Sequence, residues 1–188
     1  MTMQTDAPAA KNGVDIAALL EARTALSETP SAALFTWRAR CEWQNGTHSR
    51  SVVDGFFGLG AEQTHSRSFE IDADHPLQFA AEDKGATPVE IVLSALASCL
   101  SAGVASVAEN RGIRLRKVSA TVEGDMNLYG VLGIDADVRN GFGAVRVHFK
   151  VDADATPEEI AALVAQSQKR SAVFDIITNP TNVHVTVG

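Results

Sequence analysis

The residues with the clearest capacity for chemistry in this sequence are its two cysteines, Cys41 and Cys99. Cys99 lies in a run of small and apolar residues and has two interpretations. It is either a small buried hydrophobe, as free cysteines commonly are, or a reactive thiolate, which needs a nearby stabilising group and some access. Cys41 alternates with charged residues along an expected strand, on its apolar side, which favours packing. The spacing of the two cysteines fits neither a metal site nor a secreted disulfide framework.

The histidines offer no comparable pattern. Their spacing contains neither HxH nor HExxH, so the sequence predicts no metal site and no bound cofactor. Residues 55–60 contain three glycines without a phosphate-loop or dinucleotide pattern, and we interpret them as a flexible connection. The five histidines are scattered along the chain at His48, His65, His75, His148 and His184.

Length and charge limit the classes of function. A chain of 188 residues fits one domain with a substantial core. Its net charge of −7 argues against nucleic acid or an anionic membrane as a partner. We expect a cytoplasmic protein, because no signal peptide is recognisable and the cysteines suit a reducing compartment.

The element that must position Cys99 is a helix beginning at Thr87-Pro88-Val89-Glu90. Threonine is a good N-cap, proline suits the first helical position and the glutamate completes a capping box. Gly112 suits the left-handed residue after the helix end. The segment between is apolar or small on all sides, so we expect a helix buried on nearly every face. Its length would span a membrane, but its serines, glycine and alanines favour a core helix.

The flanking segments predict an α+β fold with antiparallel pairing, because hairpins and meanders connect the expected strands. The Asn45-Gly46 pair predicts a hairpin turn, and Thr156-Pro157 repeats the helix start seen at Thr87. The expected order is a disordered arm over 1–12, an amphipathic helix over 15–27, strands over 35–43, 48–54 and 66–72, a loop over 72–86, the central helix, strands over 118–123 and 145–151 separated by a long excursion, a helix from 157, and a last strand over 183–187.

Several segments together resemble the OsmC/Ohr family, the osmotically inducible and organic-hydroperoxide-resistance proteins. The resemblance covers roughly Phe35 to Val187, and the order and spacing of the segments carry it rather than one motif. The resembling segments are Thr87–Glu90 through Ala97–Leu100, the acidic-proline loop Asp74-His75-Pro76, Tyr129–Gly133, and Lys169–Pro180, which is similar to a branch with a Ser-Pro-Val-Phe-Asp segment.

The resemblance implies an OsmC-like fold in which antiparallel sheets wrap around a buried central helix and two protomers intertwine as a homodimer. It also implies a reaction. In the family's peroxidases the helix cysteine attacks the O–O bond of an organic hydroperoxide and becomes a sulfenic acid. A second cysteine then resolves it as a disulfide, assisted by an arginine and a glutamate.

This sequence departs from that scheme at the second cysteine and at the glutamate. Ser171 stands where the resolving cysteine would fall, so an outside thiol, or Cys41 if the fold brings it near, would have to resolve a sulfenic acid on Cys99. Val89 stands at the family's acidic position, and Glu90 is better explained as the capping acid. Arg50 lies near the family's arginine and is either an activator of the thiolate or a solvated strand charge.

Two functions remain open from the sequence. The first is a thiol-dependent peroxidase, with Cys99 as nucleophile, Arg50 as activator, an organic hydroperoxide as substrate and an external thiol as reductant. The second is an OsmC-like binding or scaffold protein that takes a small hydrophobic ligand and has no redox activity. In both, residues 1–30 form an N-terminal arm and helix outside an OsmC-like domain of residues 31–188, and neither partner is a nucleic acid or a membrane.

Overall fold

The computed structural model describes residues 12–188, so most of the arm expected over residues 1–12 lies outside the described residues. Its last residue, Asn12, is held in place: its side-chain amide donates to the carbonyl of Ile113 and accepts from the backbone N–H of Leu115, both at 2.8 Å. The chain divides into two compact units, which are described separately. One contains residues 12–16 and 93–188, and the other contains Ala17–Val92.

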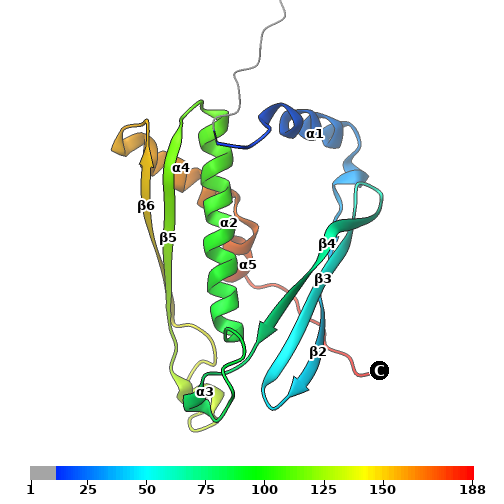
Figure 1. Ribbon diagram of the computed structural model, residues 1–188, viewed down its shortest axis with the longest axis vertical. Coiled ribbons are helices and arrows are strands. Elements are labelled where there is room, and N and C mark those ends of the chain that lie inside the picture. The colour runs from blue at the N-terminus through cyan, green and yellow to red at the C-terminus, as the bar shows by residue number, and fades with distance from the viewer. Residues whose placement is uncertain (1–11) are drawn as a thin grey trace, which may run out of the picture. The chain divides into compact units, whose positions relative to one another are not determined.

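The first unit is built on a long two-stranded antiparallel sheet (Figure 1). Strands β5 (Leu115–Asp125) and β6 (Ala144–Ala153) pair along their length, with Val118 opposite Val151 and Val122 opposite Val147. Burial alternates along both strands, which confirms the expected half-buried pattern. The excursion between the strands contains a short helix, α3 (Leu128–Val131).

Two helices cover the apolar face of this sheet and form its core. α2 (Pro88–Asn110) runs beside the strands, and α4 (Pro157–Arg170) packs next to it (Figure 1). The centre of the core is Val104, Val107 and Ala108 of α2 with Leu163 of α4, and Val118 and Phe149 of the sheet pack against them. Burial of this apolar stripe holds α2 in place.

The ends of α2 lie where the sequence predicts them. The backbone N–H of Thr87 donates to the Glu90 carboxylate at 2.8 Å, and the N–H of Glu90 faces the Thr87 hydroxyl at 3.4 Å, which is a capping box. At the other end Gly112 has φ +66°, and the N–H of Ile113 bonds to the carbonyl of Ala108. Both signals act within one helical turn, so the sequence alone was sufficient to place them.

The expectation that α2 is buried on nearly every face is wrong for the single chain. Its fully buried side chains form one stripe, while Val92 is 42% exposed and Ala95, Ser98 and Ala102 are also exposed. An apolar helix with one uncovered face of small residues has room for another element against it. The buried stripe consists of Leu96, Leu100, Val104, Val107 and Ala108.

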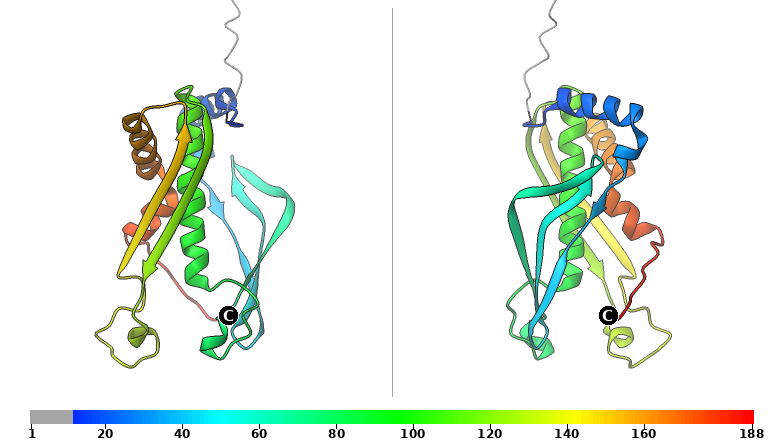
Figure 2. Two further views of the ribbon diagram at one scale, coloured as in Figure 1. Left: turned by 60° about the vertical axis from the view of Figure 1, so that its left-hand side comes forward. Right: turned by 90° about the vertical axis from the view of Figure 1, so that its right-hand side faces the viewer.

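The second unit is a four-stranded antiparallel sheet preceded by a helix, α1 (Ile16–Glu28). Strand β3 (His48–Gly58) is central: β1 (Thr36–Trp37) and β2 (Arg40–Asn45) pair with it on one side, and β4 (Ala61–Ala73) pairs on the other. The short 3₁₀ helices Pro30–Ala33 and Leu77–Phe79 lie in the connections. Figure 2 shows that the β3–β4 hairpin is long and curved. Together the two units confirm an α+β fold with antiparallel sheets.

Several predictions for the second unit need correction. Residues 55–58 are not a flexible connection but the end of β3, with a tight turn at Leu59 and Gly60. Gly55 is needed there because a Cβ would lie 2.6 Å from the carbonyl oxygen of Gln63. The strand expected over 35–43 is interrupted after Trp37. The helix expected over 15–27 is confirmed as α1, although α1 buries none of its residues.

The C-terminal strand expected over 183–187 is absent from the described chain. Residues 180–188 have no regular structure, and Val183, Val185 and Val187 are 79%, 87% and 98% exposed. Alternating valines favour a strand only where a neighbouring strand completes the hydrogen-bond ladder, and among residues 12–188 no strand pairs with this segment. An unexpected helix, α5 (Ala172–Thr178), precedes it.

The close approach of α2 and α4 gives a prediction at Gly103. A Cβ there would clash with the Ser167 hydroxyl and lie 3.0 Å from the Ser167 Cβ. Glycine-to-alanine exchange in a helix normally stabilises by roughly 1 kcal/mol, but overpacking should reverse the sign and cost Gly103→Ala about 1–3 kcal/mol in urea unfolding. Gln168→Ala, at an exposed site on α4, should change stability by less than about 0.5 kcal/mol. A stabilised Gly103→Ala protein would contradict the close packing.

Candidate functional site

Cys99 lies in the middle of α2 and is half-buried. Its Sγ accepts a hydrogen bond from the Ser171 hydroxyl, with an O–S distance of 3.1 Å. Ser171 itself is only 6% exposed. The sulfur therefore combines partial access with a directed donor, which a packed core cysteine does not require.

The packing of α4 on α2 places Ser171 beside the sulfur. One turn before Ser171, the hydroxyl of buried Ser167 donates to the carbonyl of Leu100 at 2.6 Å and fixes the separation of the two helices. Ser171 ends α4 and also caps α5, where its oxygen accepts from the N–H of Phe174 at 3.1 Å. Its backbone is thus set by two helix ends at once.

Arg50 lies on β3 and is paired with acidic residues of β4. Its Nε donates to Asp72 at 3.0 Å and its Nη2 at 3.3 Å, and Glu70 lies 3.9 Å from Nη1. His48 also contacts the Asp72 carboxylate, at 2.7 Å. The Arg50 and His48 hydrogen bonds lower the pKa of Asp72, and the Asp72 hydrogen bond raises the pKa of Arg50. Arg50 therefore forms a half-exposed ion pair between neighbouring strands.

The other residues singled out from the sequence fall in different places. Cys41 is exposed on β2, opposite Ser51, so the expectation that it is packed is wrong for the single chain. Glu90 is confirmed as the capping acid of α2. Cys99 belongs to the first unit, whereas Arg50 and Cys41 belong to the second. A functional pairing of Cys99 with either residue stays a prediction.

Asp74, in the acidic-proline loop, is a structural anchor. It is 1% exposed and its carboxylate accepts from the Thr47 hydroxyl at 2.6 Å, the His75 N–H at 2.8 Å and the Lys84 N–H at 3.1 Å. These donors, led by Thr47, lower its pKa from 3.8 to about 2. The carboxylate thereby ties the loop after β4 to the β2–β3 turn.

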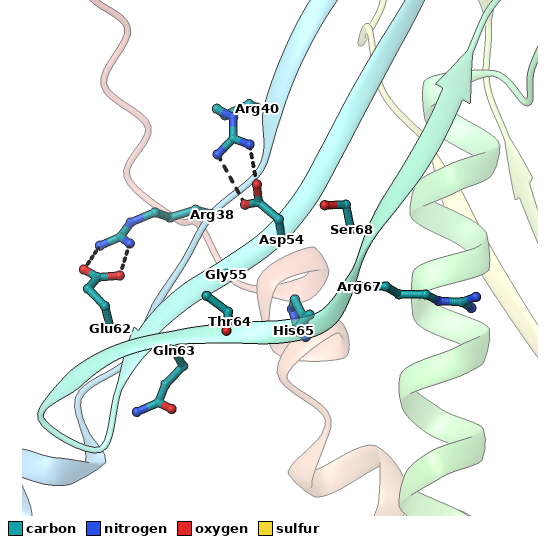
Figure 3. Close-up of a pocket in the computed structure, with 10 residues that line it drawn as sticks. All are labelled: Arg38, Arg40, Asp54, Gly55, Glu62, Gln63, Thr64, His65, Arg67 and Ser68. Atoms are coloured by element: carbon teal, nitrogen blue, oxygen red, sulfur yellow. Dashed lines mark hydrogen bonds and ion pairs between the residues drawn. The ribbon is translucent and has the colours of Figure 1, made fainter.

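A polar pocket of about 460 Å³ lies on the sheet of the second unit (Figure 3). The β3–β4 ladder opens here, because Val53 pairs with Phe69 while Gly55 pairs with Thr64, so four residues of β4 oppose Asp54 alone. Arg40 forms an ion pair with Asp54 across the pocket, and Arg38 does so with Glu62. The charges of the pocket are thus largely matched within it, which indicates a structural role for these pairs.

Among residues 12–188, no group of three or more His, Cys, Asp or Glu side chains is arranged to hold a metal ion. Cys99 is therefore the described residue around which we build a candidate site. The structure thus defines a class: α+β proteins with antiparallel sheets that carry a half-buried cysteine on a long core helix.

The sequence matches the model of the family described as OsmC-like protein over residues 81–186, which is more than half of the chain. The chain belongs to the OsmC-like protein family. The matched region contains α2 with Cys99, both strands of the first sheet, α4 and α5. A comparison with curated protein sequences gave no match.

Solved structures of this family share the fold. An OsmC-like protein from Mycoplasma pneumoniae is 17% identical with a TM-score of 0.58, covering 76% of this chain and 87% of its own. The organic hydroperoxide resistance protein OsmC from Legionella pneumophila is 22% identical with a TM-score of 0.53, covering 77% and 90%. An organic hydroperoxide resistance protein from Elizabethkingia anophelis is 16% identical with a TM-score of 0.53, covering 76% and 88%. These identities support the fold alone.

In length and composition, α2 could also cross a membrane. This is weak evidence, because the core helices of soluble proteins have the same composition. The core that α2 forms with α4 and the β5–β6 sheet, and its place in the OsmC-like family, are consistent with a soluble protein.

Two features of the site were missed from the sequence. The contact of Ser171 with Cys99 depends on helix packing, although Ser171 followed by Phe174, with Asn179-Pro180 beyond, carries the signal of a short capped helix. The pairing of Arg50 with Asp72 depends on strand register, which places the two residues directly opposite each other. The Asn45-Gly46 turn sets the register of β2 against β3 and gives no signal for the β3–β4 register.

Asp74 gives a prediction about acid stability. A carboxyl whose pKa is lower in the folded state than in the unfolded state stabilises the fold above its unfolded pKa, and this contribution is lost as the pH falls through the folded value. The Asp74 contribution should therefore be present above about pH 4 and lost between about pH 4 and 2. Asp74→Asn should lower the urea midpoint at pH 7, and its difference from the unmodified protein should vanish near pH 2.

Asp83→Asn, at an exposed position in the same loop, is the matched control because it removes the same charge. It should leave the urea midpoint nearly unchanged at both pH values. A difference for Asp74→Asn that stays constant from pH 7 to pH 2 would show that the ionised form of Asp74 is not what stabilises the loop.

Proposed function

We propose that this protein is a thiol-dependent peroxidase of the cytoplasm that reduces organic hydroperoxides at Cys99. The observation that carries the proposal is the half-buried Cys99 sulfur, which accepts a hydrogen bond from buried Ser171. Membership of the OsmC-like family and the two structural relatives named organic hydroperoxide resistance proteins support the choice of substrate.

The proposed reaction is a two-electron reduction of the peroxide. The Cys99 thiolate attacks one peroxide oxygen, the S–O bond forms as the O–O bond breaks, and the alkoxide leaves with a proton as an alcohol. Cys99 becomes a sulfenic acid, and its sulfur has supplied both electrons. No metal or bound cofactor takes part in these steps.

An external thiol completes the cycle. Because Ser171 has no sulfur, it cannot form a disulfide with Cys99. A first small thiol displaces water from the sulfenic acid to give a mixed disulfide, and a second displaces Cys99 and leaves as the oxidised disulfide. The sum is one hydroperoxide and two thiols converted to an alcohol, water and one disulfide. Cys41, exposed on β2, is the other thiol that could resolve Cys99.

In this proposal Arg50 activates the thiolate. A guanidinium near the sulfur would stabilise its negative charge and bind a peroxide oxygen. Its pairing with Asp72 and Glu70 argues for a purely structural role instead. For Arg50 to act as activator, its ion pairs with Asp72 and Glu70 would have to open, or some of its N–H groups would have to remain available to the substrate.

A second candidate function is an OsmC-like protein that binds a small hydrophobic ligand without redox activity. Three observations favour it: Ser171 in place of a second cysteine, Val89 in place of an acid, and the ion pairs of Arg50. In that case Cys99 would be a packing residue. The fate of Cys99 with peroxide separates the two functions.

We further propose an intertwined homodimer in which residues 31–188 form the OsmC-like domain and residues 1–30 an additional arm and helix. The exposed small-residue face of α2 and the exposed C-terminal valines support this assembly, because both are apolar surfaces without cover in the single chain. Trp37 and Trp43, 68% and 72% exposed, are further surface of this kind.

The peroxidase proposal predicts that Cys99 forms a sulfenic acid with a slight excess of cumene hydroperoxide. A sulfenic-acid trap followed by mass spectrometry should label Cys99 rapidly, because a stabilised thiolate reacts faster than a neutral thiol. Dithiothreitol added before the trap should prevent labelling, because it reduces the sulfenic acid first. Cys99→Ser should abolish labelling. If the sulfenic acid can be trapped for longer in Cys41→Ser than in the unmodified protein, Cys41 is the resolving thiol.

Two further variants refine this experiment. Arg50→Gln should slow labelling if Arg50 is the activator, whereas Arg40→Gln, from the neighbouring strand β2, should not. Labelling of Cys99 no faster than that of an unfolded thiol would reject the peroxidase and leave the binding function.

The proposed assembly predicts a dimer at micromolar concentration. Light scattering should give about twice the chain mass of 19.9 kDa, because the uncovered apolar faces become buried on association. Ala102→Glu should favour the monomer, because it places a charge on the exposed apolar face of α2. A monomeric unmodified protein at this concentration would contradict the dimer.

A further inference from the structure

Ser171 occupies an unusual position for a serine because its hydroxyl makes two hydrogen bonds in a nearly water-free place. The oxygen lies 3.1 Å from the Cys99 sulfur and 3.1 Å from the Phe174 nitrogen, and the residue is 6% exposed. A hydroxyl has one proton and two lone pairs. Since the Phe174 N–H donates to the oxygen, the hydroxyl proton is left for the sulfur.

The direction of this bond is fixed by the fold rather than by the side chain alone. Ser171 is the C-cap of α4 and the N-cap of α5, so its backbone is held from both sides. One turn earlier Ser167 bonds to the Leu100 carbonyl, the residue next to Cys99 in α2. Together the two serines lock α4 against the segment of α2 that carries the sulfur.

A donor aimed at sulfur favours the charged form of the thiol. Hydrogen bonds to an ionised group are stronger than those between neutral groups, so the Ser171 bond strengthens when Cys99 loses its proton. A cysteine at position 171 would offer a weaker donor, since S–H donates poorly. A serine at this position is therefore more than a missing thiol, because it is the better hydrogen-bond donor to the sulfur.

We propose that the Ser171 hydroxyl stabilises and orients the Cys99 thiolate as its fixed hydrogen-bond donor. This inference deepens the proposed function and rests on it for its biological meaning, but the hydrogen bond itself is testable without peroxide. Ser171 takes no part in covalent chemistry and exchanges no electrons. It sets how much thiolate is present and where its lone pairs point.

The test is the rate of alkylation of Cys99 by iodoacetamide as a function of pH, in a Cys41→Ser background where Cys99 is the only thiol. Only the thiolate reacts, so the midpoint of the rate profile reports the protonation of Cys99. Ser171→Ala should move this midpoint upward by about one pH unit, which slows alkylation roughly tenfold below the midpoint. Ser171→Thr retains a hydroxyl and should restore the original midpoint.

Two controls separate this role from a structural one. Ser171→Asp keeps an N-cap for α5 but replaces the donor by a negative charge, so it should raise the midpoint at least as far as Ser171→Ala. Thr156→Ala removes the capping hydroxyl at the other end of α4 and should lower thermal stability without moving the midpoint. Equal midpoints in the serine, alanine and aspartate proteins would overturn the proposal, as would an equal shift in Thr156→Ala.

Failure of the proposed function gives a different pattern. If the midpoint shifts as expected but cumene hydroperoxide does not label Cys99, the hydrogen bond is as proposed and the peroxidase is rejected. If peroxide labels Cys99 equally fast in the serine and alanine proteins and their midpoints agree, the peroxidase stands and the role of Ser171 is rejected.

Discussion

The burial of one apolar stripe of α2 is the constraint on which the first unit depends. Val104, Val107 and Ala108 pack with Leu163 of α4, over the inner face of the β5–β6 sheet. This packing leaves no freedom for α4 to slide, because Gly103 lets the Ser167 hydroxyl reach the backbone of α2. A hydroxyl satisfied in this way costs little to bury, whereas an unsatisfied one would cost about 1–3 kcal/mol. Apolar burial brings the helices together, and a polar bond sets their register.

The same register decides the surroundings of Cys99. Ser167 and Ser171 are one helical turn apart, so both face α2. Ser167 bonds to Leu100 and Ser171 to the preceding residue, Cys99. The candidate site is thus positioned by the packing of two core helices and not by a loop. Sites built on packed helices hold their geometry well, so core packing fixes the direction of the Ser171 hydrogen bond to the sulfur.

The sequence was informative where the signal is local. The caps at Thr87 and Thr156 and the alternation along β5 and β6 placed the two long helices and the first sheet correctly. It failed where a distant partner decides the outcome. The glycines over 55–58 continue β3 because β4 pairs with them, and the valines over 183–187 form no strand because no neighbour pairs with them in the described chain. For the site, residue type pointed to Cys99, but strand register and helix packing chose the partners of Arg50 and Cys99.

Under the proposed function, a hydroxyl rather than a thiol at position 171 has two consequences. A hydroxyl cannot join the sulfur covalently, so an oxidised Cys99 has no resolving partner at that position. The same hydroxyl is a stronger donor than a thiol. In the proposed reaction, Ser171 therefore prepares the first step at Cys99 and leaves the last step to an outside thiol. The proposed reaction thus rests on the thiolate that the Ser171 bond maintains and on access of an outside thiol to the half-buried sulfur.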